Sequence, residues 1–203
     1  LGGDHVSRNP GAVHRDKINS KDRGLERFHR HIEDLMSLGA ELGLKALCLE
    51  PMSSLAEPPS TPDEVTDMMS RLAAHHQQSH LSTIPAYLCG DISHGVADRD
   101  QNIIHDNWEL FIHEIPWLAE FHFKNTDPVF NSTFGFSPEE QKRGIVDLHR
   151  IKTILDQHTD SFPVDILVGY LEIGGPKIGR DYSDPLLADS LRTSIRALKH
   201  VFP

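Results

Sequence analysis

Apolar residues recur at intervals of three and four in five stretches of the chain, and short apolar runs lie between these stretches. The first pattern is typical of amphipathic helices, and the second of strands buried on both faces. Ser137, Pro138 and Glu140 form the strongest local signal, an N-cap serine with a helix-starting proline and a capping glutamate. We predict helices over 24–42, 63–78, about 101–115, from Ser137 through Leu155 and from Asp184 to Phe202. Strands are predicted over 45–49, 85–89, 118–123 and 164–171. Residues 4–21 are predicted to form a polar loop.

The predicted strands and helices alternate along the chain, which is typical of a parallel sheet covered by helices. The opening residues Leu1, Gly2 and Gly3 resemble the end of one more strand, so five strands are each followed by a helix. A complete (β/α)8 TIM barrel needs about 250 residues, and this chain has 203. We therefore predict an α/β fold in which residues 1–203 form a single TIM-barrel domain, made of the C-terminal five units with the N-terminal three missing. A complete open sheet of five strands is the alternative.

The net charge and the hydropathy of the chain indicate which kinds of partner, nucleic acid or membrane, it is unsuited to bind. The formal net charge of −10 disfavours a nucleic-acid surface, because such a surface needs clustered Lys and Arg. No apolar run approaches the roughly 20 residues that span a bilayer, and the first residues lack the basic and apolar regions of a signal peptide. We expect a cytoplasmic protein that binds neither nucleic acid nor membrane. The sequence leaves open whether it forms a homo-oligomer.

Four apolar runs end at a residue that can bind a metal ion. These residues are three carboxylates and one imidazole: Glu50, Asp91, His122 and Glu172. In a barrel the C-terminal ends of parallel strands converge on one mouth, so these side chains are expected to meet there. A mainly oxygen-donor set with one imidazole suits Mn²⁺, Mg²⁺ or Co²⁺ better than thiolate-seeking metals. The residues therefore predict one divalent ion, with Mn²⁺ as the first choice.

Two cysteines accompany this set. Cys48 and Cys89 each lie in a strand run, two residues before a predicted ligand. Because side chains alternate along a strand, each thiol should share the face of that ligand. We expect two buried thiols and no disulfide. The histidines outside the candidate site, His29 among them, are expected on the surface.

The segments after the strands also carry a family resemblance. They are Gly-Gly at 2–3, Leu-Glu-Pro-Met at 49–52, Gly-Asp-Ile-Ser-His at 90–94, Phe-His-Phe-Lys-Asn at 121–125 and Glu-Ile-Gly-Gly at 172–175. The chain resembles the sugar phosphate isomerase/epimerase superfamily of xylose-isomerase-like TIM barrels, and within it the ketose 3-epimerases of the tagatose and psicose type. The resemblance covers most of the chain, and its specificity lies in the order of the segments, each after its own strand.

This resemblance implies a site and a reaction. It makes Glu50, Asp91, His122 and Glu172 the metal ligands, and His94 a substrate-binding histidine. The implied reaction is a metal-dependent inversion at C3 of a ketose through an enediolate. One glutamate removes the C3 proton and the other returns a proton to the opposite face, because a single base would mostly restore the original configuration. We assign these catalytic roles to Glu50 and Glu172 and leave the direction open.

The chain departs from the tagatose-type pattern at two positions. Pro128 and Ala56 stand where those enzymes carry an arginine and a glutamate, so the far end of the substrate must be held differently. Lys124, Lys177 and Arg180 are the candidate residues, and the last two follow a Gly-Gly pair. Cations beside a glycine-rich backbone suit a phosphate, so we expect a short ketose phosphate of about four or five carbons.

Three alternatives remain at this level. An aldose–ketose isomerase on the same barrel would use the same metal and carboxylates. A phosphodiesterase of the endonuclease-IV type shares the barrel, but it needs several zinc ions, many histidine ligands and a basic surface. A non-catalytic barrel fragment that serves as a binding module is the last.

Overall fold

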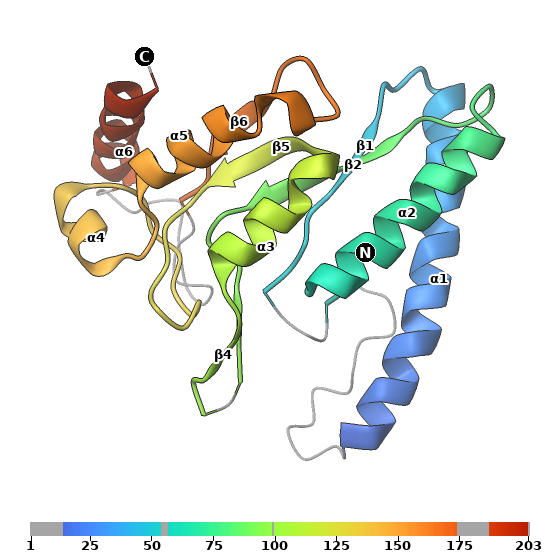
Figure 1. Cartoon of the computed structure of the whole chain (residues 1–203), viewed down its shortest axis with the longest axis horizontal. Helices are drawn as coiled ribbons and strands as arrows, with labels where there is room; N and C mark the ends of the chain where they lie inside the picture. Colours follow the sequence, from blue (N-terminus) through green and yellow to red (C-terminus); the bar gives the residue numbers. More distant parts are fainter. Residues whose placement is uncertain (1–13, 54–56, 99, 174–186, 203) are drawn as a thin grey trace. The chain divides into compact units, whose positions relative to one another are not determined.

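The computed structural model describes residues 14–53, 57–98, 100–173 and 187–202. The chain divides into two compact units, Leu1–Tyr87 and Leu88–Pro203, called here the first and second units. Both mix helices with strands, as predicted (Figure 1). None of the described helices has the length and apolar character that crossing a bilayer requires.

The first unit contains two helices that lie side by side (Figure 1). The second of these helices buries Val65, Met68, Met69 and Leu72. The intervals of three and four between these residues in the sequence predict that buried face. Its start is set by Thr61, whose side chain accepts a hydrogen bond from the backbone N–H of Glu64. The elements of this unit are α1 (His14–Glu41), β1 (Leu47–Leu49), α2 (Pro62–Gln78) and the start of β2 (Ala86–Asp91).

Three expectations for the first unit are wrong. Helix α1 begins at His14 and not at Gly24, so residues 14–21 are helical. These polar residues have no apolar periodicity, yet they include no proline or glycine that would end a helix. Cys48 is exposed, because it occupies the open face of β1 between Leu47 and Leu49. His29 is buried, with 5% of its surface exposed.

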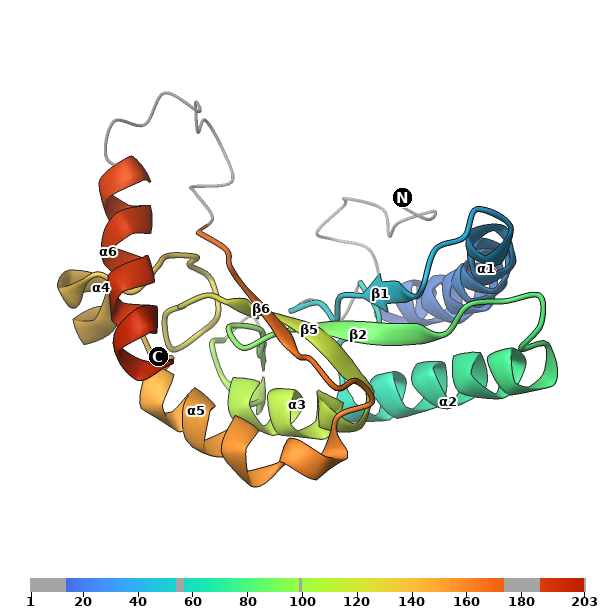
Figure 2. The same ribbon diagram turned by 90° about the horizontal axis from the view of Figure 1, so that it is seen from above.

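The second unit is built on a parallel arrangement of β2, β5 (Leu118–Phe123) and β6 (Val168–Leu171), with β5 in the middle. Asp91 of β2 is paired with His122 of β5, and His122 with Tyr170 of β6. Helices α3 (Asn107–Glu114) and α5 (Leu148–Gln157) lie along one side of β5 (Figure 2). The predicted parallel sheet is therefore confirmed, and no closed barrel is seen in the described part of the chain.

The predicted helix over 101–115 is wrong at its start. Residues before Asp106 form a small antiparallel hairpin, β3 (Val96–Ala97) with β4 (Ile103–His105). The helix α3 begins only at Asn107, because the Asp106 carboxylate accepts hydrogen bonds from the N–H groups of Trp108 and Glu109. Such a cap stops a helix from extending further towards the N-terminus.

The helix predicted from Ser137 is in fact two helices, α4 (Pro138–Arg143) and α5. The capping box of Ser137 and Glu140 is present, as predicted. Gly144 ends α4 in an extended conformation, and a Cβ atom at this position would collide with the side chain of Asn125. Asp147 then caps the start of α5 by accepting from the N–H of Arg150.

The last strand and the last helix also differ from expectation. β6 is shorter than the predicted strand 164–171 and is not buried on both faces, since Val168 and Tyr170 are 38% and 49% exposed. Helix α6 (Leu187–Val201) buries Ser194 and Val201. Ile195 is exposed, although its spacing of four from Leu191 and three from Leu198 in the sequence predicts an inward position. Its predicted start at Asp184 lies outside the described residues.

Candidate metal centre

Three parallel strands bring the candidate residues of the second unit to one edge of the sheet. Asp91 ends β2, His122 and Lys124 lie at the end of β5, and Glu172 follows β6 directly. The N–H of Glu172 donates to the carbonyl of Phe123 at 3.1 Å, which extends the pairing of β5 with β6 by one step. Because the strands are parallel, these four side chains emerge at the same end.

Asp91, His122 and Glu172 each place one ligand atom within 4.8 Å of the others. His122 Nδ1 is 2.9 Å from Glu172 Oε2 and 3.7 Å from Asp91 Oδ2. Oxygen ligands lie about 2.0–2.6 Å from Mg²⁺ or Ca²⁺, so atoms that share one ion lie within about 5 Å of one another. The three predicted ligands of this unit are therefore close enough to hold a single divalent ion.

The two carboxylate oxygens of Asp91 have different surroundings. Oδ1 accepts hydrogen bonds from the N–H and the hydroxyl of Ser93, at 2.8 and 2.7 Å. Oδ2 faces Lys124 Nζ at 2.6 Å and His94 Nε2 at 3.2 Å. The turn that follows Asp91 is held by Asn107, whose Nδ2 donates to the carbonyl of Ile92 at 2.7 Å. Ser93 and Asn107 thus fix the carboxylate so that one oxygen points into the cluster.

The cluster keeps its carboxylates ionised. Burial opposes the charged form of Asp91, but the nearby imidazole of His122, together with His94 and the ammonium group of Lys124, holds its pKa below the usual range. For Glu172 the hydrogen bond with His122 is the main cause of a lowered pKa, against which partial burial acts. Burial also disfavours the charged form of Lys124, yet Asp91 and Glu172 raise its pKa above the ordinary value. At neutral pH the cluster contains two carboxylates and one ammonium group.

Cys89 is one of the two thiols that the sequence predicted to be buried, and it is buried beside the candidate ligand His122. Its Sγ lies 3.4 Å from Nε2 of His122. The imidazole thus presents Nε2 to the thiol and Nδ1 to the carboxylates. A neutral imidazole that binds a metal through Nδ1 must carry its proton on Nε2, so the ring orientation suits the role of a ligand.

The donor set of the described residues fits a hard divalent ion. Two anionic oxygens and one imidazole nitrogen match the preference of Mn²⁺ or Mg²⁺, and the thiol of Cys89 lies on the far side of the imidazole ring. The ammonium group of Lys124 lies against the same oxygens, so the cluster already accommodates a positive charge.

The other predicted site residues fall in different places. His94 belongs to the cluster, through its contact with Asp91. Glu50 follows β1 in the first unit, at the strand end where it was expected, and its part in the site stays a prediction. Lys177 and Arg180 lie outside the described residues, as do Gly2, Gly3 and Ala56.

Lys124, Ser93 and Asn107 are the residues whose place in the cluster was not predicted. Lys124 was expected at the far end of the substrate, yet its ammonium contacts both carboxylates. The signal was present, because Lys124 follows His122 by two residues and must share its face of β5. No comparable signal exists for Asn107, which reaches the turn after Asp91 from α3.

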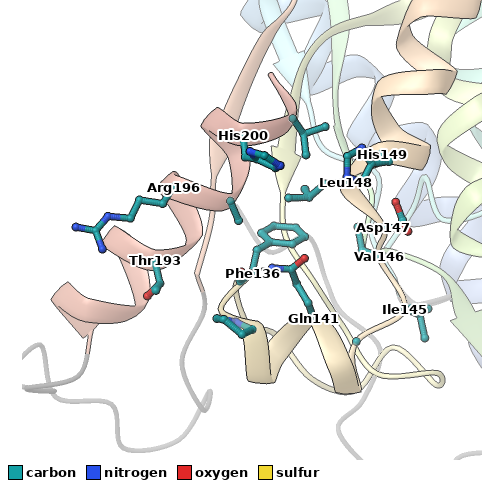
Figure 3. A pocket seen from close by; sticks show the side chains of 14 residues that line it. Phe136, Gln141, Ile145, Val146, Asp147, Leu148, His149, Thr193, Arg196 and His200 are labelled. Atoms are coloured by element: carbon teal, nitrogen blue, oxygen red, sulfur yellow. Dashed lines mark hydrogen bonds between the residues drawn. The ribbon is translucent and has the colours of Figure 1, made fainter. Parts of the chain in front are cut away.

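A separate cavity of about 600 Å³ lies between α4, α5 and α6 (Figure 3). Phe136 and Leu148 form part of its apolar lining, and His149 and His200 stand at its side. Arg196 points away from it in the same view. None of the candidate ligands lines this cavity.

Comparison with known proteins supports the fold. No protein-family model and no curated protein sequence matches the chain. Among solved structures it is similar to a protein of Rhodospirillum rubrum ATCC 11170 named "Putative Xylose isomerase", with a TM-score of 0.67 and 23% sequence identity over 94% of this chain. This chain spans 60% of the length of that protein. The likeness shows that the chain has a xylose-isomerase-like fold.

Proposed function

We propose that this chain carries the metal site of a sugar isomerase or epimerase, and that its reaction is inversion at C3 of a ketose. One observation carries the proposal: Asp91, His122 and Glu172 emerge from successive parallel strands and place their ligand atoms within 4.8 Å of one another. The xylose-isomerase-like fold supports it, because the active sites of barrel folds lie at this end of the strands.

Glu50 completes the proposed site. It follows β1 directly, just as Glu172 follows β6, so both occupy the same position relative to their strands. In the proposal Glu50 is the fourth ligand and the second acid/base residue. A divalent ion, Mn²⁺ as first choice and Mg²⁺ or Co²⁺ as alternatives, would offset the negative charge on two adjacent substrate oxygens by several kcal/mol.

The residues of the chain perform the proton transfers. One of Glu50 and Glu172 takes the proton from C3 of the ketose, which leaves an enediolate. The other glutamate, protonated at the start, gives its proton to the opposite face of C3, so the configuration inverts. Proton exchange with water then restores both glutamates to their starting states. In the proposal His94, which lies beside Asp91, hydrogen-bonds a substrate hydroxyl.

The proposal also specifies the substrate as a ketose that carries a phosphate group. Its support is the pair Lys177 and Arg180, which follow two glycines in the sequence. If these residues bind a phosphate, kcat/KM should be higher for a ketose phosphate than for the free ketose. Equal values for the two substrates would remove the phosphate from the proposal and leave the epimerase.

An aldose–ketose isomerase is the second candidate, and the name of the solved neighbour favours it. The same carboxylates would then move a proton between C1 and C2. Proton NMR of the product separates the two reactions, since an epimerase yields a second ketose and an isomerase yields an aldose. The net charge of −10 disfavours an endonuclease-IV-type activity, because the substrate of such an enzyme is a nucleic acid. Binding of abasic DNA by the protein would support that activity.

The test of the proposed function is metal dependence. We expect the purified protein to contain one equivalent of a divalent ion by elemental analysis, to lose turnover on chelation and to regain it with Mn²⁺. Turnover that persists with no divalent ion would end the proposal. A protein that neither binds an ion nor turns over a sugar would favour the non-catalytic alternative.

A further inference from the structure

Lys124 lies inside the cluster of candidate ligands. It shares the inward face of β5 with His122, two residues earlier, and only 7% of its surface is exposed. Its Nζ lies 2.6 Å from Asp91 Oδ2 and 3.2 Å from Glu172 Oε2. A lysine that links two carboxylates in this way contributes the positive charge that brings them together.

The oxygens that Lys124 contacts are those available to a metal ion. Asp91 Oδ1 is engaged by Ser93, so Oδ2 is the oxygen that faces the cluster. Glu172 Oε2 faces both Lys124 and His122. An ion bound to Asp91, Glu172 and His122 would therefore need the same two oxygens that Lys124 contacts.

Two cations compete for such a site. A divalent ion within bonding distance of Oδ2 and Oε2 would lie a few ångströms from the ammonium group, where like charges repel strongly. The backbone of Lys124 follows β5, which is paired on both sides by β2 and β6. Its flexible four-carbon side chain is therefore the part that can move.

We propose that Lys124 is a resident counter-ion of this site, which holds Asp91 and Glu172 together in the metal-free protein and leaves their oxygens when a divalent ion binds. The inference rests on the proposed function, because it takes these residues as metal ligands. It adds a consequence: the ammonium group released by the ion is available to an oxygen of the substrate. Lys124 thus keeps the metal ligands close together when no ion is bound, and its competing charge lowers the affinity of the site for the ion.

The test is titration of chelator-treated protein with Mn²⁺ by isothermal calorimetry. Lys124→Met removes the competing charge, and we expect its Kd for Mn²⁺ to be lower than that of the wild type by about tenfold or more, which is about 1.4 kcal/mol. The same variant should unfold at a lower temperature than the wild type when no metal is present. Lys199→Met, at an exposed position of α6, is the matched control and should change neither value.

The outcomes separate the inference from the proposed function. If the wild type binds Mn²⁺ and Lys124→Met binds it equally or more weakly, the counter-ion role is overturned and the metal site stands. If neither protein binds Mn²⁺, both proposals fail. Lys124→Gln, which keeps hydrogen-bond donors without the charge, replaces the methionine variant if that variant does not fold, and the same gain in affinity is expected of it.

Discussion

At the scale of single residues, the carboxylate of Glu172 is less constrained than that of Asp91. Its side chain is 43% exposed, whereas that of Asp91 is fully buried and held by Ser93. A residue that takes a proton from the substrate needs access to it and a carboxylate that is ionised before the reaction. Glu172 meets both conditions, since its pKa is held low by His122 and Lys124.

Replacing this carboxylate should abolish the chemistry and keep the fold. We expect Glu172→Gln to lower kcat by about 10²–10⁴-fold, the usual contribution of a general acid or base. The measurement is turnover together with solvent deuterium incorporation at C3, with circular dichroism to check the fold. Glu139→Gln, at an exposed position of α4, should keep the normal rate. A near-normal rate in Glu172→Gln would count against its catalytic role.

At the scale of elements, β5 and the loop after it connect the site to the helices. Phe121 lies on the other face of β5 from His122, and its ring meets that of Phe111 on α3 at 5.7 Å between centroids. Asn125, fully buried just beyond β5, accepts hydrogen bonds from the N–H groups of Thr126 and Val146. This amide thereby links the end of β5 to the segment between α4 and α5.

Gly144 is required for that link because Asn125 occupies the space where a side chain would be. We expect Gly144→Ala to lower the free energy of unfolding by about 1–3 kcal/mol, the usual cost of overpacking a well-packed site. Gly24→Ala is the control with opposite sign. Nothing lies within 4 Å of a Cβ atom there, so alanine in place of glycine in α1 should stabilise by up to about 1 kcal/mol. Urea unfolding followed by circular dichroism measures both, and equal stability of Gly144→Ala and the wild type would contradict the prediction.

At the scale of the whole molecule, ionised groups shape the dependence of stability on pH. In the first unit Arg71 pairs with Glu26 and Glu33, and its Nη1 lies 3.0 Å from Nδ1 of His29. Arginine can only donate, so His29 must accept and therefore be neutral. Burial first, and then the charge of Arg71, lower the pKa of His29.

The sign of the pH effect follows from this. The unfolded chain binds a proton at His29 more readily than the folded chain does. The contribution of His29 to the free energy of unfolding is therefore complete above the ordinary histidine pKa, near 6.5. It is lost as the pH falls from there through the lower pKa of the folded state. The lowered pKa values of Asp91, Asp127 and Glu140 add a second loss of stability in more acidic solution. We expect the urea midpoint to fall between pH 7 and pH 5 in the wild type and in His31→Gln, an exposed position on the same helix, and to fall less in His29→Gln. Parallel curves for all three proteins would refute the assignment to His29.

Some features of the structure were predicted from local sequence patterns and others were not. The helix faces of α2, the capping box at Ser137, the strand β5 and the placement of Asp91, His122 and Glu172 at strand ends were all predicted. The hairpin before Asp106 and the break at Gly144 were not. Apolar periodicity reports which face of an element is buried, but it does not report a close contact with a distant residue such as Asn125.

The sequence by itself determined the alternation of strands and helices and the residue types at the strand ends, because both follow from spacings of a few residues. Only the tertiary structure decided what surrounds those residues. Asn107 reaches the turn after Asp91 from α3, and Lys124 links two carboxylates. These contacts join positions up to 48 residues apart, and hydrogen bonds and charge pairs of that kind depend on distances in space, which no local period of the sequence encodes.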